Sequence, residues 1–191
     1  RDKLVTGVQT CALPIWLVVI TPQVFGDHRG FFLETYSREA FAKAGLHYDF
    51  VQDNHARSGP KGVLRGLHFQ LPPATQAKLV WVTRGAVFDV AVDLRVGSPT
   101  YKKWFGIELT ADNFKRLMVP WGFAHGYVTL TEDAEFMYKV DAPYAPDKDA
   151  GIAWDDPDIG VAWPVTSPIL SAKDAAQPRL ADVGSPFEMR P

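Results

Sequence analysis

Two residues that can do chemistry lie three positions apart in one apolar stretch. Residues 62–70 read Gly-Val-Leu-Arg-Gly-Leu-His-Phe-Gln, which places Arg65 and His68 between glycines and aliphatic side chains. Imidazole titrates near neutral pH, so a histidine in a pocket can take up and return a proton. Because neighbours in a strand alternate between faces, we expect His68 on one face and Arg65 on the other. An isolated histidine is more often held by a backbone carbonyl, so this stretch alone does not decide the role of His68.

A second histidine, His125, follows a turn that reads Pro-Trp-Gly-Phe-Ala-His-Gly over residues 120–126. Around both stretches, many short runs of β-branched and aromatic residues are bounded by Gly and Pro, which is typical of a sandwich or jelly roll. The clearest helix begins at the N-cap Ser37 and closes at Gly45, and a short one begins at Ser171. The expected fold is all-β, a double-stranded β-helix (cupin jelly roll) with a few short helices.

Metal-binding proteins of this fold supply a His-x-His pair from the first such stretch and another histidine from the second. Here the first stretch reads His68-Phe69-Gln70, so an amide occupies the second ligand position. A divalent metal site generally needs at least three good protein ligands. The sequence therefore predicts no metal and no other cofactor, and it leaves His68 and His125 for acid–base chemistry.

The overall composition is that of an ordinary globular protein. The 191 residues are 47% hydrophobic and 22% charged, and the net charge of −2 gives no general attraction to nucleic acid. The single cysteine, Cys11, allows no intrachain disulfide, which favours a reducing, cytoplasmic compartment. The apolar run 11–20 is too short to span a bilayer. We expect one domain over 17–191 and interpret residues 1–16 as a non-native or disordered segment.

Segments along the chain match one family of sugar-nucleotide enzymes in the family's own order. They are Val24-Phe-Gly-Asp27 with Arg29-Gly-Phe-Phe32, Phe50-Val-Gln-Asp-Asn-His55, Val63-Leu-Arg-Gly-Leu-His-Phe-Gln70, Val87-Phe-Asp-Val-Ala-Val-Asp93, Pro120-x-Gly-Phe-Ala-His-Gly126 and Glu135-Phe-x-Tyr-Lys139. Each segment alone is a weak signal, but together they leave chance a poor explanation. The sequence resembles the dTDP-4-dehydrorhamnose 3,5-epimerase family of the rhamnose pathway.

The resemblance implies epimerisation of dTDP-4-keto-6-deoxy-D-glucose at C3 and C5 to dTDP-4-keto-L-rhamnose. Both protons lie next to a ketone, so inversion needs a base on one face, an acid on the other and stabilisation of the enolate between them. His68 is the implied base, Asp174 the carboxylate that orients its ring, and Tyr138 the acid on the opposite face. Lys78 would stabilise the oxyanion, with help from His125.

The remaining implied roles are in substrate binding. Arg65 in its own subunit and Arg29 from a neighbour would hold the diphosphate, since the planar guanidinium suits phosphate oxygens. The resemblance thus implies a homodimer whose neighbour contributes Arg29 and Glu34. Further contacts to the nucleoside and sugar are implied for Glu34, Gln52, Asp53, Asn54, His125, Asp149 and Lys173, with Asp149 standing where the family commonly has Glu.

Three other functions are considered. A relative acting on only one of the two carbons would use the same His68 and Tyr138, so the sequence does not separate single from double epimerisation. A non-catalytic cupin that binds sugar nucleotides is the second, and the complete set of His68, Asp174 and Tyr138 argues against it. A metal-dependent oxygenase or isomerase is the third, and Gln70 in a ligand position disfavours it.

Overall fold

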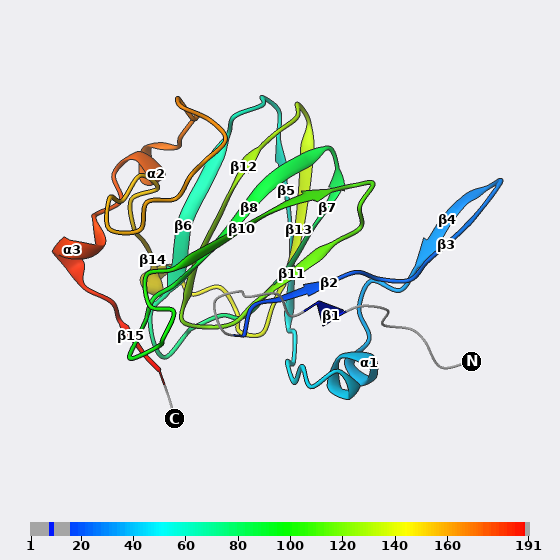
Figure 1. Cartoon of the computed structure of the whole chain (residues 1–191), viewed down its shortest axis with the longest axis horizontal. Coiled ribbons are helices and arrows are strands. Elements are labelled where there is room, and N and C mark those ends of the chain that lie inside the picture. The colour runs from blue at the N-terminus through cyan, green and yellow to red at the C-terminus, as the bar shows by residue number, and fades with distance from the viewer. Residues whose placement is uncertain (1–7, 10–15, 190–191) are drawn as a thin grey trace.

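The structure is a computed structural model that describes residues 8–9 and 16–189, and two β-sheets packed face to face form its body (Figure 1). Among these residues, the first sheet has the order β1 (Val8–Gln9), β2 (Val18–Ile20), β11 (Arg116–Val119), β7 (Lys78–Arg84), β13 (Ala134–Val140) and β5 (Gln52–Ser58). The second has the order β10 (Trp104–Thr110), β8 (Ala86–Asp93), β12 (Phe123–Thr129), β6 (Leu64–Gln70) and β14 (Asp149–Gly151). Neighbouring strands in both sheets are antiparallel, and the predicted jelly roll is confirmed.

Shorter elements surround the two sheets. The strands β3 (Val24–Asp27) and β4 (Gly30–Leu33) form a hairpin, and β9 (Arg95–Val96) pairs in parallel with β15 (Phe187–Glu188). The helices are α1 (Arg38–Lys43), α2 (Ala172–Ala175), α3 (Leu180–Val183) and the 3-10 turn η1 (Pro146–Lys148). Both predicted N-caps are confirmed, because the Ser37 hydroxyl accepts from the N–H of Ala40 and the Ser171 hydroxyl from the N–H of Asp174.

Apolar side chains fill three layers because each sheet is covered on both faces. Between the sheets, Val80 of β7 and Val87 of β8 belong to one buried cluster. The outer face of β8 contributes Val90 to a second cluster, which the C-terminal segment covers with Leu180 and Phe187. The strand β8 is therefore apolar on both faces, as strands buried on both sides are. A third cluster joins the outer face of the first sheet to α1.

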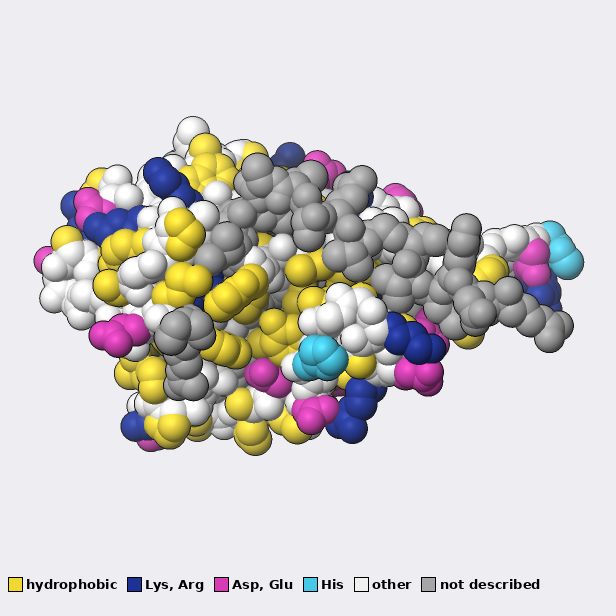
Figure 2. All heavy atoms as spheres, turned by 60° about the horizontal axis from the view of Figure 1, so that its bottom comes forward, with side chains coloured by type: hydrophobic (Ala, Val, Ile, Leu, Met, Phe, Trp, Pro, Cys, Tyr) yellow, Lys and Arg dark blue, Asp and Glu magenta, His cyan; other side chains and the backbone are white. Residues whose placement is uncertain are grey.

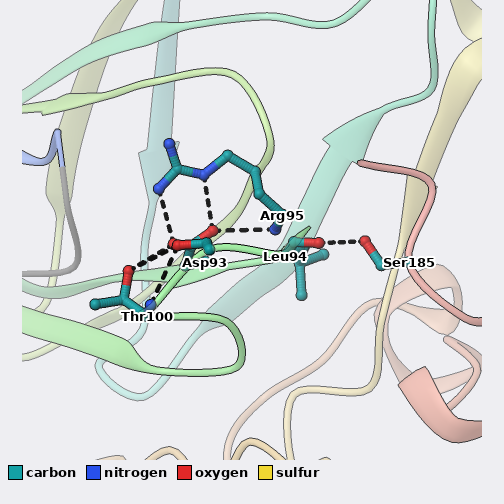
Figure 3. Close-up of polar contacts among 6 residues, drawn as sticks. Asp93, Leu94, Arg95, Thr100 and Ser185 are labelled. Atoms are coloured by element: carbon teal, nitrogen blue, oxygen red, sulfur yellow. Dashed lines mark hydrogen bonds and ion pairs between the residues drawn. The ribbon is translucent and has the colours of Figure 1, made fainter. Parts of the chain in front are cut away.

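A buried ion pair fixes the end of β8. Arg95 donates from Nε to Asp93 Oδ1 at 2.8 Å and from Nη2 to Asp93 Oδ2 at 2.7 Å, and both side chains are fully buried. The Thr100 hydroxyl donates to the same carboxylate, and the Ser185 hydroxyl donates to the Leu94 carbonyl (Figure 3). Burial alone would raise the pKa of Asp93, but these hydrogen bonds outweigh it and lower the pKa. This carboxylate therefore has a structural role.

The β3–β4 hairpin projects from the body as an arm (Figures 1 and 2). Its aromatic side chains are largely uncovered, since Phe25 is 52%, Phe31 64% and Phe32 70% exposed. Within the chain, Phe31 packs edge-on against Phe114, with ring centroids 4.8 Å apart. Exposed aromatic patches of this kind are typical of surfaces that a partner covers.

The N-terminal segment bears on two sequence predictions. Most of residues 1–16 lies outside the described residues, and within it Val8–Gln9 pairs with β2. The interpretation of this segment as non-native therefore stays a prediction. In the described part of the chain, no helix has the length and the apolar character that a membrane crossing requires.

Candidate active site

A pocket of about 290 Å³ opens between the two sheets. Strands β5, β7 and β13 of the first sheet, strands β6 and β12 of the second, and helix α2 contribute its walls. Most of the residues predicted to act on the substrate line it together: Arg65, His68, Lys78, His125, Tyr138, Lys173 and Asp174. The tertiary structure thus gathers residues that lie more than a hundred positions apart in the sequence.

Arg65 and His68 share this pocket because β6 contains a β-bulge. His68 lies opposite His125 and Arg65 opposite Tyr127, so three steps along β6 match two steps along β12. The extra residue reverses the face alternation between the two side chains. The expectation that they face opposite sides was therefore wrong. The bulge requires glycine at Gly66, whose φ is +140° and where a Cβ would lie 2.6 Å from a backbone atom of β12.

His68 is paired with Asp174 across 106 positions of sequence. Its Nε2 lies 2.5 Å from Asp174 Oδ1, which also accepts from the Gly66 N–H at 3.3 Å. The Ser171 hydroxyl donates to the other oxygen, Oδ2, at 2.6 Å, so the N-cap of α2 helps to fix the carboxylate. Asp174 is 5% exposed. With Nε2 on Asp174, Nδ1 is the ring nitrogen that can take up a proton.

The surroundings shift the pKa values of three of the residues predicted to act on the substrate. Burial lowers the pKa of His68 below its ordinary 6.5, although the Asp174 charge opposes this shift. The ring is therefore neutral, and able to act as a base, at pH 7. Burial also lowers the pKa of Lys78 to about 8. The pKa of Tyr138 is raised, because burial outweighs the opposing charge of Arg65. The phenol therefore keeps its proton at neutral pH.

A second histidine–carboxylate pair borders the same pocket through its histidine, and sequence reasoning missed its acid. His125 Nε2 is 3.0 and 3.1 Å from the two carboxylate oxygens of Asp89 on β8. Asp89 is fully buried in a strand that is apolar on both faces. A carboxylate in such a strand must have a partner. The position of Asp89 within the alternating run 86–93 was therefore the sequence signal that could have indicated this pair. The negative charge of Asp89 also opposes the lowering of the Lys78 pKa by burial.

The predicted contacts on β5 divide between two faces of the strand. Gln52 and Asn54 alternate with exposed residues and lie on the face of Ala56, which lines the pocket. The Gln52 amide donates to Asn54 Oδ1 at 2.8 Å, which orients both side chains. Asp53 lies on the opposite face, where its carboxylate accepts from Lys139 Nζ at 2.8 Å. The structure therefore does not bring Asp53 to the pocket.

Comparison with known proteins identifies the family. The family model for dTDP-4-dehydrorhamnose 3,5-epimerase matches residues 15–182. The chain belongs to the dTDP-4-dehydrorhamnose 3,5-epimerase family. The family predicted from the motifs is thereby confirmed, and the chain is an isomerase of the epimerase class.

Relatives of this epimerase match it over most of their length. The dTDP-4-dehydrorhamnose 3,5-epimerase of Sinorhizobium fredii is 51% identical over 171 residues, covering 89% of this chain and 88% of the relative. The crystal structure of the Bacillus anthracis enzyme with TDP and PPi bound has a TM-score of 0.85 at 49% identity, covering 86% of this chain and 94% of that one. The Legionella pneumophila enzyme in complex with dTDP-4-keto-L-rhamnose has a TM-score of 0.86 at 42% identity, covering 91% and 94%.

At the rim of the epimerase pocket, Asp149 and Lys173 form an ion pair. The Tyr144 hydroxyl also donates to Asp149, at 2.8 Å to Oδ2. Burial would raise the pKa of Asp149, but the hydrogen bonds from Lys173 and Tyr144 outweigh it and keep the carboxyl ionised at neutral pH. These three residues therefore form a charged, hydrogen-bonded edge beside the pocket.

Gln70, which stands where metal-binding cupins have a ligand, is engaged with the backbone in this epimerase. Its Nε2 donates to the Ala74 carbonyl at 2.6 Å, and its Oε1 accepts from the Ala145 N–H at 2.7 Å. The side chain therefore ties the loop after β6 to the loop after β13. Over the residues that the structure describes, no group of three or more His, Cys, Asp or Glu side chains is arranged to hold a metal ion.

Arg29 and Glu34 lie on or next to the arm and do not line the pocket of their own chain. Arg29 lies near the tip of the hairpin, where its guanidinium pairs with Asp27 at 2.5 Å. Glu34 directly follows β4 and faces a small cavity at the base of the arm. If these two residues contact the substrate, the pocket in question belongs to another subunit.

Proposed function

We propose that this epimerase inverts both C3 and C5 of dTDP-4-keto-6-deoxy-D-glucose, giving dTDP-4-keto-L-rhamnose, with His68 as the base and Tyr138 as the acid. The observation that carries the proposal is the placement of the His68–Asp174 pair on one sheet and its helix, with Tyr138 on the facing sheet of the same pocket. A sugar held between the sheets would present opposite faces to the two groups. The family membership supplies the substrate class.

Each step of this reaction uses one group of the pocket. The Nδ1 atom of His68 takes the proton from the carbon next to the ketone, and the electron pair of the C–H bond moves into an enolate. The carboxylate of Asp174 stabilises the imidazolium that results. The ammonium of Lys78 stabilises the oxyanion. The phenol of Tyr138 then donates its proton to the opposite face of the carbon, and solvent restores both side chains.

The pocket is completed by a second subunit in the proposed assembly, a cytoplasmic homodimer. The exposed aromatic arm is the surface that a second copy would cover, and it carries Arg29 and ends at Glu34. Arg29 of the neighbour would then join Arg65 on the diphosphate, while Glu34, Gln52 and Asn54 would bind the nucleoside and sugar hydroxyls.

Deuterium exchange tests the proposed chemistry directly. We expect proton NMR of dTDP-4-keto-6-deoxy-D-glucose in D₂O with the wild-type chain to show deuterium entering both C3 and C5. His68→Ala should abolish both exchanges while dTDP still binds. Exchange at one carbon only would replace the proposal with single-centre epimerisation. An absence of exchange in wild-type chain that still binds dTDP would make it a binding protein.

A further inference from the structure

Tyr127 on β12 lines the pocket and has a hydroxyl that the proposed chemistry does not use. Its ring stacks on Phe136, with centroids 4.1 Å apart and an interplanar angle of 20°, so the side chain is held in one position. The residue lines the pocket and is only 5% exposed. Among the described residues, its buried hydroxyl has no hydrogen-bond partner. A buried hydroxyl without a partner is costly, which raises the question of what satisfies it.

The neighbours of this hydroxyl are Arg65, the proposed ligand of the diphosphate, and Ser58. Arg65 donates from Nε to the Ser58 hydroxyl oxygen at 3.3 Å, and Ser58 is 3% exposed. Tyr127 lies directly opposite Arg65 in the pairing of β12 with β6, and both residues line the pocket. Burial raises the pKa of Tyr127, and Arg65 and Ser58 oppose that shift. The charges of Asp89 and Tyr138 add to the upward shift of this pKa.

The hydrogen-bonding capacities of these groups allow the Tyr127 proton to be directed at an acceptor in the pocket. Arginine can only donate, and the Ser58 oxygen already accepts from Arg65. The Ser58 hydroxyl can in turn donate to the phenol oxygen of Tyr127, which leaves the Tyr127 proton for an acceptor in the pocket. A phosphate oxygen held by Arg65 is such an acceptor, and a hydrogen bond to an ionised group is the strong kind.

We propose that Tyr127 is a substrate-binding residue, which donates a hydrogen bond from its hydroxyl to the diphosphate beside Arg65, and that Ser58 positions both side chains. This inference rests on the proposed function, since it takes Arg65 as a ligand of the diphosphate. The aromatic ring alone would fill the same space in the core. The hydroxyl is therefore the part of Tyr127 whose removal tests the proposal.

The test is Tyr127→Phe in the full-length chain, which keeps the ring and removes one oxygen. Isothermal titration with dTDP should give a Kd about tenfold higher than that of the wild type, the effect of losing one hydrogen bond to a charged group. The KM for the sugar nucleotide should rise by a similar factor while kcat changes little. Thymidine, which has no phosphate, should bind the variant and the wild type equally by saturation-transfer NMR.

Two further variants test the positioning role of Ser58 and separate substrate binding from catalysis. Ser58→Ala should also raise the Kd for dTDP, because Arg65 loses the hydroxyl that holds it. Tyr138→Phe should show the reverse split, with kcat lost and the Kd for dTDP kept. An unchanged Kd for dTDP in Tyr127→Phe overturns the proposal, and so does an equal loss of thymidine affinity. A third outcome separates the two proposals. If Tyr127→Phe weakens dTDP binding but the wild-type chain catalyses no deuterium exchange, only the proposed reaction is overturned.

Discussion

Histidine and aspartate each occur in contrasting surroundings in this molecule. Nε2 of His68 contacts Asp174 and its Nδ1 is left to react, whereas Nε2 of His125 lies between both oxygens of a fully buried Asp89. Asp93, four residues after Asp89 on the same strand, is saturated by Arg95 and the hydroxyls around it. Residue type therefore indicates which chemistry is possible, and the partners of each side chain decide which of these residues can react.

The shifted pKa values of His68 and Lys78 predict a bell-shaped dependence of kcat/KM on pH. Activity should fall as pH drops through a value below 6.5, because His68 must be unprotonated to act as base. It should also fall as pH rises through about 8, because Lys78 must keep its proton to stabilise the oxyanion. The measurement is kcat/KM of the wild-type chain between pH 5 and about 9.5.

Matched carboxamide variants assign the two limbs of that profile. The charge of Asp174 raises the pKa of His68, so Asp174→Asn should move the acid limb to lower pH and reduce kcat by about 100-fold. The charge of Asp149 raises the pKa of Lys78, so Asp149→Asn should move the basic limb to lower pH. A basic limb that stays in place in Asp149→Asn would contradict the assignment to Lys78.

Individual elements show how far the sequence could predict this site. The helix starts at Ser37 and Ser171 were predictable because an N-cap depends on a few neighbouring residues. The common pocket of Arg65 and His68 was not, because the bulge exists only in the pairing of β6 with β12. The contact of His68 with Asp174 came from family resemblance, since spacing along the chain says nothing about pairs 106 positions apart.

The close approach of β6 and β12 at the bulge gives a prediction on stability. A Cβ at Gly126 would lie 2.7 Å from the Arg65 carbonyl oxygen and 3.0 Å from the Gly66 Cα, and backbone atoms cannot turn aside as a flexible side chain can. We expect Gly126→Ala to lower the free energy of unfolding by about 1–3 kcal/mol, measured by urea denaturation. It should also reduce kcat, since the two strands carry Arg65, His68 and His125.

Gly59 provides the matched control. It lies in the exposed loop before β6, and a Cβ there would meet no atom within 4 Å. Gly59→Ala should therefore change the free energy of unfolding by less than about 0.5 kcal/mol. Equal urea midpoints for Gly126→Ala and Gly59→Ala would mean that β6 and β12 can separate at the bulge without cost, contrary to the expectation.

The whole molecule carries two features that fit the proposed dimer. Besides the exposed aromatic residues of the arm, Arg116 lies buried at the arm's base with its guanidinium 4.6 Å above the Trp81 ring. In the described part of the chain, its Nε and Nη1 atoms have no hydrogen-bond partner, and burial lowers its pKa to about 10. The strand pattern of the sequence predicted a sandwich or jelly roll, but no local pattern could show that two nitrogens of Arg116 lack a hydrogen-bond partner among the described residues.

Subunit complementation is the decisive measurement for the proposed dimer. Arg29→Ala damages the arm and leaves the pocket of its chain intact, whereas His68→Ala damages the pocket and leaves the arm intact. If the arm serves the neighbour's pocket, each variant alone should be nearly inactive, and a mixed dimer should contain one site with both residues. Random mixing makes about half of the dimers mixed, so co-expression should restore about a quarter of the wild-type activity. If each arm instead serves the pocket of its own chain, no site in the mixed dimer has both Arg29 and His68. The co-expressed variants would then be no more active than either variant alone.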